Sequence, residues 1–350
     1  MKASYKKYTL DFKVPSGTSR GVMTQKETWF LILRDGNNFG IGECGILRGL
    51  SVDDRPDYEA QLAWACDNVH LGKDGLMNHL KAYPSIQFGV EQAFLSVNAK
   101  NPFELFPSDF TRKEAPIPIN GLIWMGDVAF MLKQLEQKLK DGFPCIKMKI
   151  GAIDFEKELS ILKSIRENFS PGEIELRVDA NGAFSPNEAM EKLEMLSNFH
   201  IHSIEQPIKA GQWEEMAKLC EKTPLPIALD EELIGVFNVT EKEKLLQTIQ
   251  PQYIILKPSL VGGIQGSGEW MDLAEKQHIG WWITSALESN IGLNAIAQYT
   301  YSLNTKMPQG LGTGSLYTNN IESPLEVSGG QLFYRQSKKW NMELIGKICT

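Results

Sequence analysis

The chain has 350 residues, enough for about two ordinary domains or for one α/β barrel of about 250 residues with a smaller partner. Hydrophobic residues make up 42% and charged residues 23%, as expected of a globular protein with a large core. The 36 basic and 43 acidic residues leave a net charge of −7, which disfavours binding to nucleic acid. No apolar run could span a membrane, and the five cysteines include no Cys-x-x-Cys pair, so we expect a cytoplasmic protein without disulfides.

Residues 1–114 carry the mixed pattern of a small α+β domain. Two alternating segments flank a turn-forming stretch and predict a hairpin: Trp29–Arg34, residues 35–38 and Phe39–Glu43. Helical patterns follow at Tyr58–Asn68 and Val90–Ala99. We expect this segment to form a cap over the domain that follows it.

Strand and helix patterns alternate through residues 115–320. The predicted strands are Ile117–Trp124, Pro144–Ile150, Glu175–Ala180, Ile201–Gln206, Pro226–Glu231, Tyr253–Pro258, Trp281–Ala286 and Gln309–Thr313. The helical stretches between them include Phe155–Asn168, Pro186–Asn198, Glu214–Lys222, Ser267–Gln277 and Leu293–Leu303. This order predicts a (β/α)7β barrel of the TIM type, in which the last helix is replaced. An open doubly wound sheet is the rival, weakened because no Gly-x-Gly-x-x-Gly follows the first strand.

The C-terminal segment, residues 321–350, is more polar. Its strand-like stretches are Gln331–Tyr334 and Glu343–Cys349. We expect them to return to the cap and complete it.

Charged residues alternate with apolar ones in two of the predicted strands. In the second strand, Lys147 and Lys149 share one face, and in the third, Glu175, Arg177 and Asp179 do so. The apolar face of a barrel strand must meet the surrounding helices, so the charged faces should point into the barrel.

Single charges end the next three strands. Glu205, Asp230 and Lys257 stand 25 and 27 residues apart, each just before turn or helix-start residues. With Lys149 and Asp179 they recur about once per strand–helix unit, which places the five at equivalent heights at the C-terminal mouth. A structural ring of salt bridges is the bland alternative, but burying five charges is costly unless function retains them.

Three converging carboxylates repel one another, and a divalent cation relieves that repulsion. Oxygen ligands alone favour Mg²⁺, with Mn²⁺ as the alternative. A lysine can act as a base near neutral pH only where a neighbouring positive charge favours its neutral form. A metal beside lysines therefore suits removal of a proton next to a carboxylate.

These motifs resemble the enolase superfamily, in its muconate-lactonising subgroup, and most nearly the o-succinylbenzoate synthases. The residues that carry the resemblance are Lys147-x-Lys149, Asp179-Ala180-Asn181, Glu205-Gln206-Pro207, Asp230-Glu231 and Lys257-Pro258. The resemblance covers the whole chain, and the lysine-base chemistry with Mg²⁺ is a known property of the superfamily.

The resemblance implies a role for each of these residues. The Mg²⁺ ligands would be Asp179, Glu205 and Asp230. Lys149 would be the general base, Lys257 would stabilise the enolate from the opposite side, and Lys147 would tune Lys149. Supporting positions would be held by Asn181, Glu231 and Arg177, the last beside the metal site in contact with substrate.

A dicarboxylate substrate fits the remaining positions. One carboxylate would bind the metal, and the other would take a hydroxyl donor from Ser285 and backbone N–H groups near Gly312. Leu47 lies in a cap segment that resembles a conserved stretch of o-succinylbenzoate synthases. Arg20 and Lys26 lie in a predicted loop that could close over the mouth. Glu288 could support the site from behind the seventh strand.

We therefore expect a lyase that converts 2-succinyl-6-hydroxy-2,4-cyclohexadiene-1-carboxylate to o-succinylbenzoate in menaquinone biosynthesis. Two alternatives use the same base and metal, namely an N-acylamino acid racemase and a dipeptide epimerase. The epimerases typically have Asp-x-Asp after the eighth strand, where this chain has Gly312-Thr313-Gly314. A catalytically silent barrel that serves as a binding protein is the alternative from another class. The sequence leaves a homo-oligomer possible.

Overall fold

The cap is built on an antiparallel sheet at the start of the chain. The structure, a computed structural model, describes residues 1–18 and 21–349. The sheet has the order β1 (Lys2–Thr18), β2 (Gly21–Asp35) and β3 (Asn38–Gly45). The predicted hairpin is confirmed, with Asp35 opposite Asn38 and Gly36 in the left-handed region at φ 58°.

Helices cover one face of this sheet. They are α1 (Tyr58–Asp67), the short 3₁₀ turn η1 (Val69–Leu71), α2 (Gly72–His79) and α3 (Pro84–Asn98), whereas α4 (Asp109–Lys113) buries its Phe110 in the core of the barrel region. Helix α3 packs directly on β3, because Gly42 and Gly89 bring the two backbones together. A Cβ atom on Gly42 would lie 1.9 Å from the carbonyl oxygen of Gly89. Larger residues there would separate the layers.

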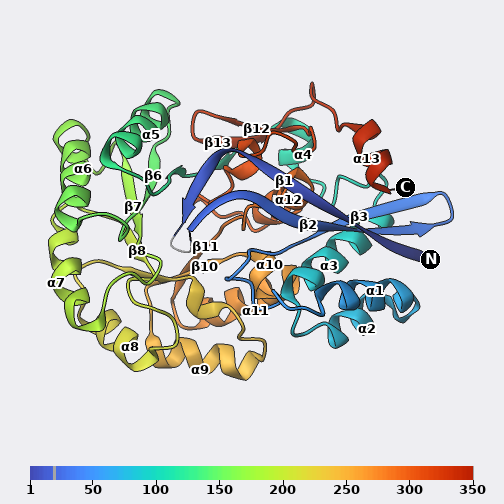
Figure 1. The fold of residues 1–350 in the computed structure, drawn as a ribbon, viewed down its shortest axis with the longest axis horizontal. Coiled ribbons are helices and arrows are strands. Elements are labelled where there is room, and N and C mark those ends of the chain that lie inside the picture. Colours follow the sequence, from blue (N-terminus) through green and yellow to red (C-terminus); the bar gives the residue numbers. More distant parts are fainter. Residues whose placement is uncertain (19–20, 350) are drawn as a thin grey trace.

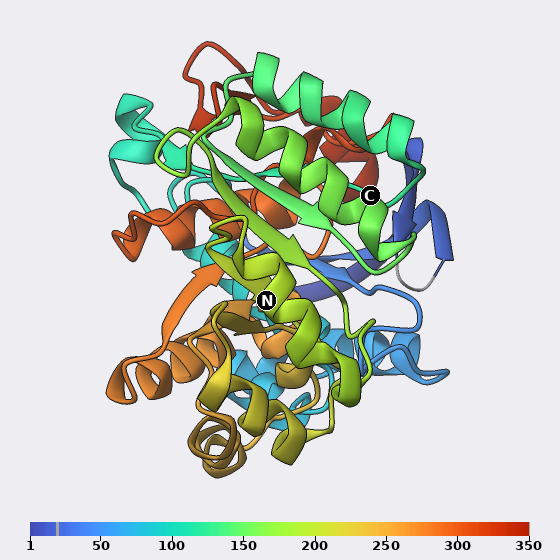
Figure 2. The same cartoon turned by 90° about the vertical axis from the view of Figure 1, so that its left-hand side faces the viewer.

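The second region is a parallel sheet that curves into a barrel. Its strands are β5 (Gly121–Ile123), β6 (Cys145–Lys149), β7 (Glu175–Asp179), β8 (Ser203–Glu205), β9 (Ile227–Leu229), β10 (Tyr253–Leu256) and β11 (Gly280–Ile283), paired in sequence order. The connecting helices are α5 (Val128–Lys140), α6 (Phe155–Asn168), α7 (Pro186–Ser197), α8 (Trp213–Lys222), α9 (Val239–Ile249), α10 (Pro258–Val261), α11 (Gly263–Lys276) and α12 (Asn290–Ser302), with short turns η2 (Glu231–Leu233) and η3 (Thr313–Ser315). Figure 1 shows α5–α9 along one side and the cap on the other, and Figure 2 shows the helices outside the strands.

Bridges close the barrel where an eighth strand was predicted. Gln309 pairs with Ile119, and Gly310 pairs with Thr284, both in parallel. Backbone hydrogen bonds reinforce these bridges, including Ser285 N–H to the Gly310 carbonyl at 2.9 Å. The barrel is thus the expected (β/α)7β type, although its eighth stave is much shorter than the predicted strand.

The period of two along each strand separates the core from the site. Ile146 and Met148 on β6 are fully buried in a hydrophobic cluster shared with the surrounding helices. Lys147 and Lys149 alternate with them and face the barrel interior, where both line a cavity. The predicted orientation of the charged faces is therefore confirmed for β6.

The C-terminal segment divides between the two regions. Strands β12 (Leu325–Ser328) and β13 (Gln331–Tyr334) form a sheet with β4 (Ile117–Pro118), at the start of the barrel region. The predicted strand Glu343–Cys349 is wrong, because residues Met342–Cys349 form helix α13. Its Ile345 and Ile348, three residues apart, are buried in one cluster with cap residues, a helical spacing. The boundaries at 114 and 320 stay a prediction.

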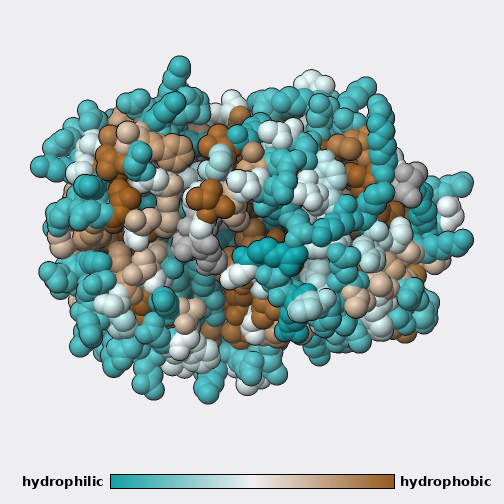
Figure 3. Space-filling view, in the orientation of Figure 1, coloured by the Kyte–Doolittle hydropathy of each residue, from teal (hydrophilic) through white to brown (hydrophobic). Residues whose placement is uncertain are grey.

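Within the described residues, no helix is both long and apolar enough to cross a bilayer. Figure 3 shows a largely hydrophilic surface on this face, with apolar residues gathered toward its middle. All five cysteines lie in the described part of the chain and are free.

Candidate active site

The charged row begins on three neighbouring strands. In the sheet register, Lys149 on β6 is opposite Asp179 on β7, and Asp179 is opposite Glu205 on β8. Each of these residues ends its strand. Since residues that share a register row point to the same side, the three side chains meet inside the mouth, as predicted.

The row then steps along the strands. Glu205 is opposite Ala228 on β9, so Asp230 lies two residues further along. Ala228 is opposite Tyr253 on β10, so Lys257 lies four residues beyond its row. The five charges are therefore staggered in register rather than level. Strands that tilt in a closed barrel require such a shift to keep the side chains at one end.

Amines and carboxylates alternate along this row. Lys149 Nζ lies 2.9 Å from Asp179 Oδ2, and Lys147 Nζ lies 3.1 Å from the same oxygen. Lys147 also contacts Glu205 Oε2 closely. Lys257 contacts Asp230 Oδ2 closely and lies 3.7 Å from Glu205 Oε1. The structure thus brings together all six predicted lysines and acids.

Burial and mutual repulsion act on the three carboxylates. Burial raises the pKa of Glu205 to about 7, and the neighbouring Asp179 and Asp230 add to that increase. Burial also raises the pKa of Asp230, despite Lys257 beside it. Burial opposes ionisation of Asp179 as well, but Lys147 and Lys149 hold its pKa well below the usual range. Burial therefore opposes ionisation of all three carboxylates, and only Asp179 has its pKa lowered overall by its lysine neighbours.

Two observations bear on a metal at this row. Within residues 1–18 and 21–349, no three His, Cys, Asp or Glu side chains are placed to hold a metal ion, and lysine amines contact the acids instead. However, Glu205 Oε1 is buried without a hydrogen-bond partner. A buried carboxylate oxygen with no donor is costly, and a hard cation is the partner it prefers. The donor set therefore fits Mg²⁺ once the lysines release the acids.

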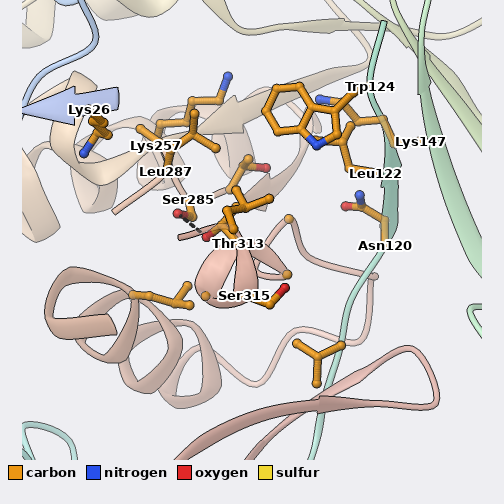
Figure 4. Close-up of a pocket in the computed structure, with 18 of the residues that line it drawn as sticks. Lys26, Asn120, Leu122, Trp124, Lys147, Lys257, Ser285, Leu287, Thr313 and Ser315 are labelled. Atoms are coloured by element: carbon orange, nitrogen blue, oxygen red, sulfur yellow. Dashed lines mark hydrogen bonds between the residues drawn. The ribbon is translucent and has the colours of Figure 1, made fainter. Parts of the chain in front are cut away.

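A cavity of about 1100 Å³ lies over the row. Three regions of the chain contribute to its walls: the cap (residues 21–27 and 46–50), the barrel strands, and the segments 310–316 and 325–332. Lys147, Lys149, Asp179 and Lys257 line it. Figure 4 shows Lys257, Leu287 and Ser285 on one side of this space and Trp124 and Lys147 on the other.

The structure places most of the predicted supporting residues at the cavity. Asn181 Oδ1 accepts a hydrogen bond from Lys149 Nζ at 2.7 Å, and its amide donates to Glu231 Oε1 at 2.9 Å. Leu47 and Gly312 also line the cavity, from the cap and from the segment after the last stave.

Arg177 lies elsewhere. It is two residues before Asp179 on the same inward face, and so one layer deeper in the barrel. Its guanidinium lies 4.5 Å from the ring centroid of Trp282 and donates to Glu175 and to the Pro308 carbonyl. Arg177 does not line the cavity, so the expected contact with substrate is not supported by its position.

Ser285 is bound in a hydroxyl network. Its Oγ donates to Glu288 Oε2 at 2.5 Å and accepts from Thr313 Oγ1 at 2.8 Å (Figure 4). Glu288 also accepts from Ser259 Oγ at 2.5 Å. Because a hydroxyl has one proton, neither Ser285 nor Thr313 has another to donate to a substrate. The donation expected from Ser285 therefore cannot be made in this arrangement.

Sequence reasoning placed Lys26 in a loop, but the residue belongs to strand β2 and lines the cavity. The sequence pattern that could have placed Lys26 in the strand is the alternation of buried residues, since Lys26, Thr28 and Phe30 share a buried face of β2. Arg20, the other residue of the predicted loop, lies outside the described residues.

Known proteins resemble the chain over nearly all its length. Residues 131–336 match the family described as Enolase C-terminal domain-like. The o-succinylbenzoate synthase of Desulfotalea psychrophila is 48% identical, over 95% of this chain and 98% of the relative. The chain belongs to the o-succinylbenzoate synthase branch of the enolase superfamily.

Solved structures agree with this family. MenC from Desulfotalea psychrophila has a TM-score of 0.85 and 44% identity, and the match covers 95% of this chain and 99% of that one. Muconate lactonizing enzyme from Pseudomonas fluorescens shares the fold, with a TM-score of 0.83, 21% identity and coverage of 99% and 98%. The chain thus has the fold expected for the o-succinylbenzoate synthase family.

Proposed function

We propose that the protein dehydrates 2-succinyl-6-hydroxy-2,4-cyclohexadiene-1-carboxylate to o-succinylbenzoate, a step of menaquinone biosynthesis. The observation that carries this proposal is the alternating row of lysines and acids under a cavity of about 1100 Å³. The 48% identity to an o-succinylbenzoate synthase supports the choice of substrate. The physiological partner is then a small dicarboxylate rather than a nucleic acid or a membrane, and a cytoplasmic location stays a prediction.

Asp179, Glu205 and Asp230 would hold Mg²⁺, or Mn²⁺ in its place. When bound there, the cation neutralises negative charge that develops on a substrate carboxylate as the neighbouring proton leaves. The unpartnered Oε1 of Glu205 supports this assignment. A group of carboxylates whose ionisation is opposed by burial gains most from such a charge.

Lys149 is the proposed base. Asp179 and Asn181 hold its amine at the cavity wall, 2.9 and 2.7 Å away respectively. The neutral amine takes the proton from the carbon next to the carboxylate, and the C–H electron pair forms the enediolate double bond. The enediolate then expels the neighbouring hydroxyl group, which accepts the proton from the Lys149 ammonium and leaves as water. Formation of an aromatic ring drives this last step.

Lys257 and Lys147 have supporting roles. Although burial opposes it, Asp230 and Glu205 raise the pKa of Lys257, so this residue stays a cation. It would stabilise the enediolate electrostatically from the other end of the row. Lys147 lies between Asp179 and Glu205 and would favour the neutral form of the neighbouring base.

The test follows the ultraviolet absorbance of the aromatic product when purified protein is mixed with the cyclohexadiene diacid and Mg²⁺. We expect turnover that chelation of the metal abolishes and Mg²⁺ restores. A catalytically silent barrel would give no change in absorbance on adding the diacid, and that result would reject the proposal.

Racemisation of an N-acylamino acid is the second candidate, because Lys149 and Lys257 both line the cavity from different strands. Two lysines on opposite faces of one substrate can exchange roles as acid and base. The protein should then incorporate deuterium at the α-carbon of either enantiomer in deuterated water. Absence of exchange with turnover of the diacid would leave dehydration alone.

A further inference from the structure

A further cation lines the cavity, from the cap rather than from the charged row of the barrel. Lys26 on β2 is only 4% exposed and lines the cavity. Its ammonium is buried and has no hydrogen-bond partner among the described residues. A buried cation without a partner is costly, and such a group is usually kept for a ligand or a reaction.

Among residues 1–18 and 21–349, no acid forms a hydrogen bond with the Lys26 ammonium. The ammonium lies over Gly45, where a Cβ atom would come within 2.5 Å of Nζ. The nearby acid is Glu43, but its two oxygens already accept hydrogen bonds from neutral donors. These come from Thr28 Oγ1, Ser289 N, Ser289 Oγ and Gly292 N, at 2.5–2.9 Å. Glu43 is thus saturated while Lys26 is not.

The substrate carries a negative charge that needs a partner in the cavity. The proposed substrate has two carboxylates, of which one lies next to the reacting carbon. The hydroxyl protons of Ser285 and Thr313 are already used within the protein, so those side chains offer no donor to the other carboxylate. Ser289 comes four residues after Ser285 and donates a hydrogen bond to Glu43. This contact connects the end of β11 to the cap near Lys26. The remote carboxylate of the substrate therefore gains no hydroxyl donor from these two side chains, whereas Lys26 offers a buried ammonium at the same cavity.

We propose that Lys26 binds the succinyl carboxylate of the substrate, the one remote from the reacting carbon, and so determines specificity for diacids. The inference rests on the proposed function. Rotation about the four side-chain bonds of Lys26 carries the ammonium from above Gly45 into the cavity. The ion pair then supplies the partner that the free protein lacks, and binding energy from a remote group positions the reacting carbon over Lys149.

A merely structural role predicts a different behaviour. If Lys26 supported the cap, its replacement by an apolar residue of similar length would lower the melting temperature and affect all substrates equally. If it is a binding residue, Lys26→Met removes an unsatisfied charge, so the melting temperature stays the same or rises while substrate binding weakens. The two roles therefore differ in the sign of the stability change.

The experiment compares Lys26→Met with the parent protein and with Lys6→Met, an exposed lysine on β1 of the same sheet. Two substrates are used: the diacid, and its analogue whose succinyl carboxylate is a primary amide. For the diacid, we expect Lys26→Met to lower kcat/KM by about 30-fold, mostly through KM, as loss of a charge-assisted bond implies. For the amide, variant and parent should be equal. Lys26→Arg should restore part of the preference for the diacid, and Lys6→Met should change nothing.

Equal losses on both substrates, or no loss on the diacid, would overturn the assignment. A failure of the proposed function looks different, because the parent itself would then turn over neither substrate. In that case, calorimetric titration with o-succinylbenzoate and its amide still tests Lys26. Weaker binding of the diacid alone by Lys26→Met would support the ion pair, and unchanged binding would reject it.

Discussion

Buried carboxylates lie on both sides of the cavity, and they are held in opposite ways. On the side of β6–β10, Asp179, Glu205 and Asp230 contact lysine amines, and one oxygen of Glu205 has no hydrogen-bond partner. On the other side, Glu43 and Glu288 accept hydrogen bonds from hydroxyls and backbone N–H groups. Fixed neutral donors satisfy a carboxylate permanently. A carboxylate held by a lysine amine can exchange that partner for a metal cation, so the kind of partner distinguishes the proposed metal site from the structural carboxylates.

The largest expected effect lies at the first side. Lys149→Ala should lower kcat for dehydration by about 10⁴-fold, the upper range for loss of a general acid–base group. Affinity for Mg²⁺, measured by calorimetry, should survive because Lys149 is not among the proposed ligands. The matched control is Lys157→Ala, an exposed lysine on α6. Unchanged turnover in Lys149→Ala would exclude it as the base.

Replacing a carboxylate on the other side of the cavity, where Glu43 and Glu288 lie, should lower the stability of the fold. Glu43→Ala leaves several buried donors of Thr28, Ser289 and Gly292 without an acceptor. We expect the free energy of unfolding to fall by about 4 kcal/mol, since each orphaned group costs about 1–3 kcal/mol. Urea denaturation measures this loss, with the exposed Glu136→Ala on α5 as the control. A loss similar to that of the control would contradict the distinction drawn between the two sides.

Another buried acid, outside both groups, offers a test by pH. Glu91 on α3 accepts hydrogen bonds from the first backbone N–H groups of α11, joining cap to barrel, yet burial raises its pKa to about 7. The folded protein therefore binds this proton more tightly than the unfolded chain. Its contribution to stability is present below about pH 4.5 and is lost as pH rises toward 7, by about 3 kcal/mol. Glu91→Gln should remove this part of the pH dependence in unfolding experiments, and a slope identical to the parent's would refute the assignment.

The smallest expected effect is on Mg²⁺ affinity, and it compares one carboxylate from each side of the cavity. Glu205→Gln keeps the shape of the side chain but removes one proposed ligand charge, so affinity for Mg²⁺ should fall by about 100-fold. Glu288→Gln makes the same chemical change on the other side of the cavity and should leave that affinity alone. Calorimetric titration with Mg²⁺ measures the affinity of both variants. Equal losses of Mg²⁺ affinity would mean that the two kinds of carboxylate do not differ.

Much of the barrel and its charged row could be predicted because strands alternate strictly. Lys147 and Lys149 had to share a face, and the regular spacing of Asp179, Glu205 and Asp230 had to bring them to one mouth. The stagger of Asp230 could not be read from spacing, since register depends on the tilt of strands in the closed barrel.

Other features depend on tertiary contacts. The last helix was mistaken for a strand because its isoleucines favour strands, although Ile345 and Ile348 have helical spacing. The donor role expected of Ser285 failed because its proton is taken by Glu288, three residues away. Lys26 was assigned to a loop because β2 begins earlier than its apolar stretch, although alternation counted back from Phe30 would have placed it on the buried face of a strand.

Strand β1 of the cap meets residues 316–317, which follow the last stave of the barrel, beside the cavity. Phe12 of β1 bridges Tyr317, and the backbone of Lys13 donates to the Leu316 carbonyl at 2.8 Å. A wall of the cavity is thus made of residues separated by some three hundred positions in the sequence. During synthesis on the ribosome, the early strands must wait for residues 310–317 before that wall can form. The substrate pocket therefore forms only after this segment has been made, and a nascent chain stalled before residue 310 should be inactive even with every catalytic residue already made.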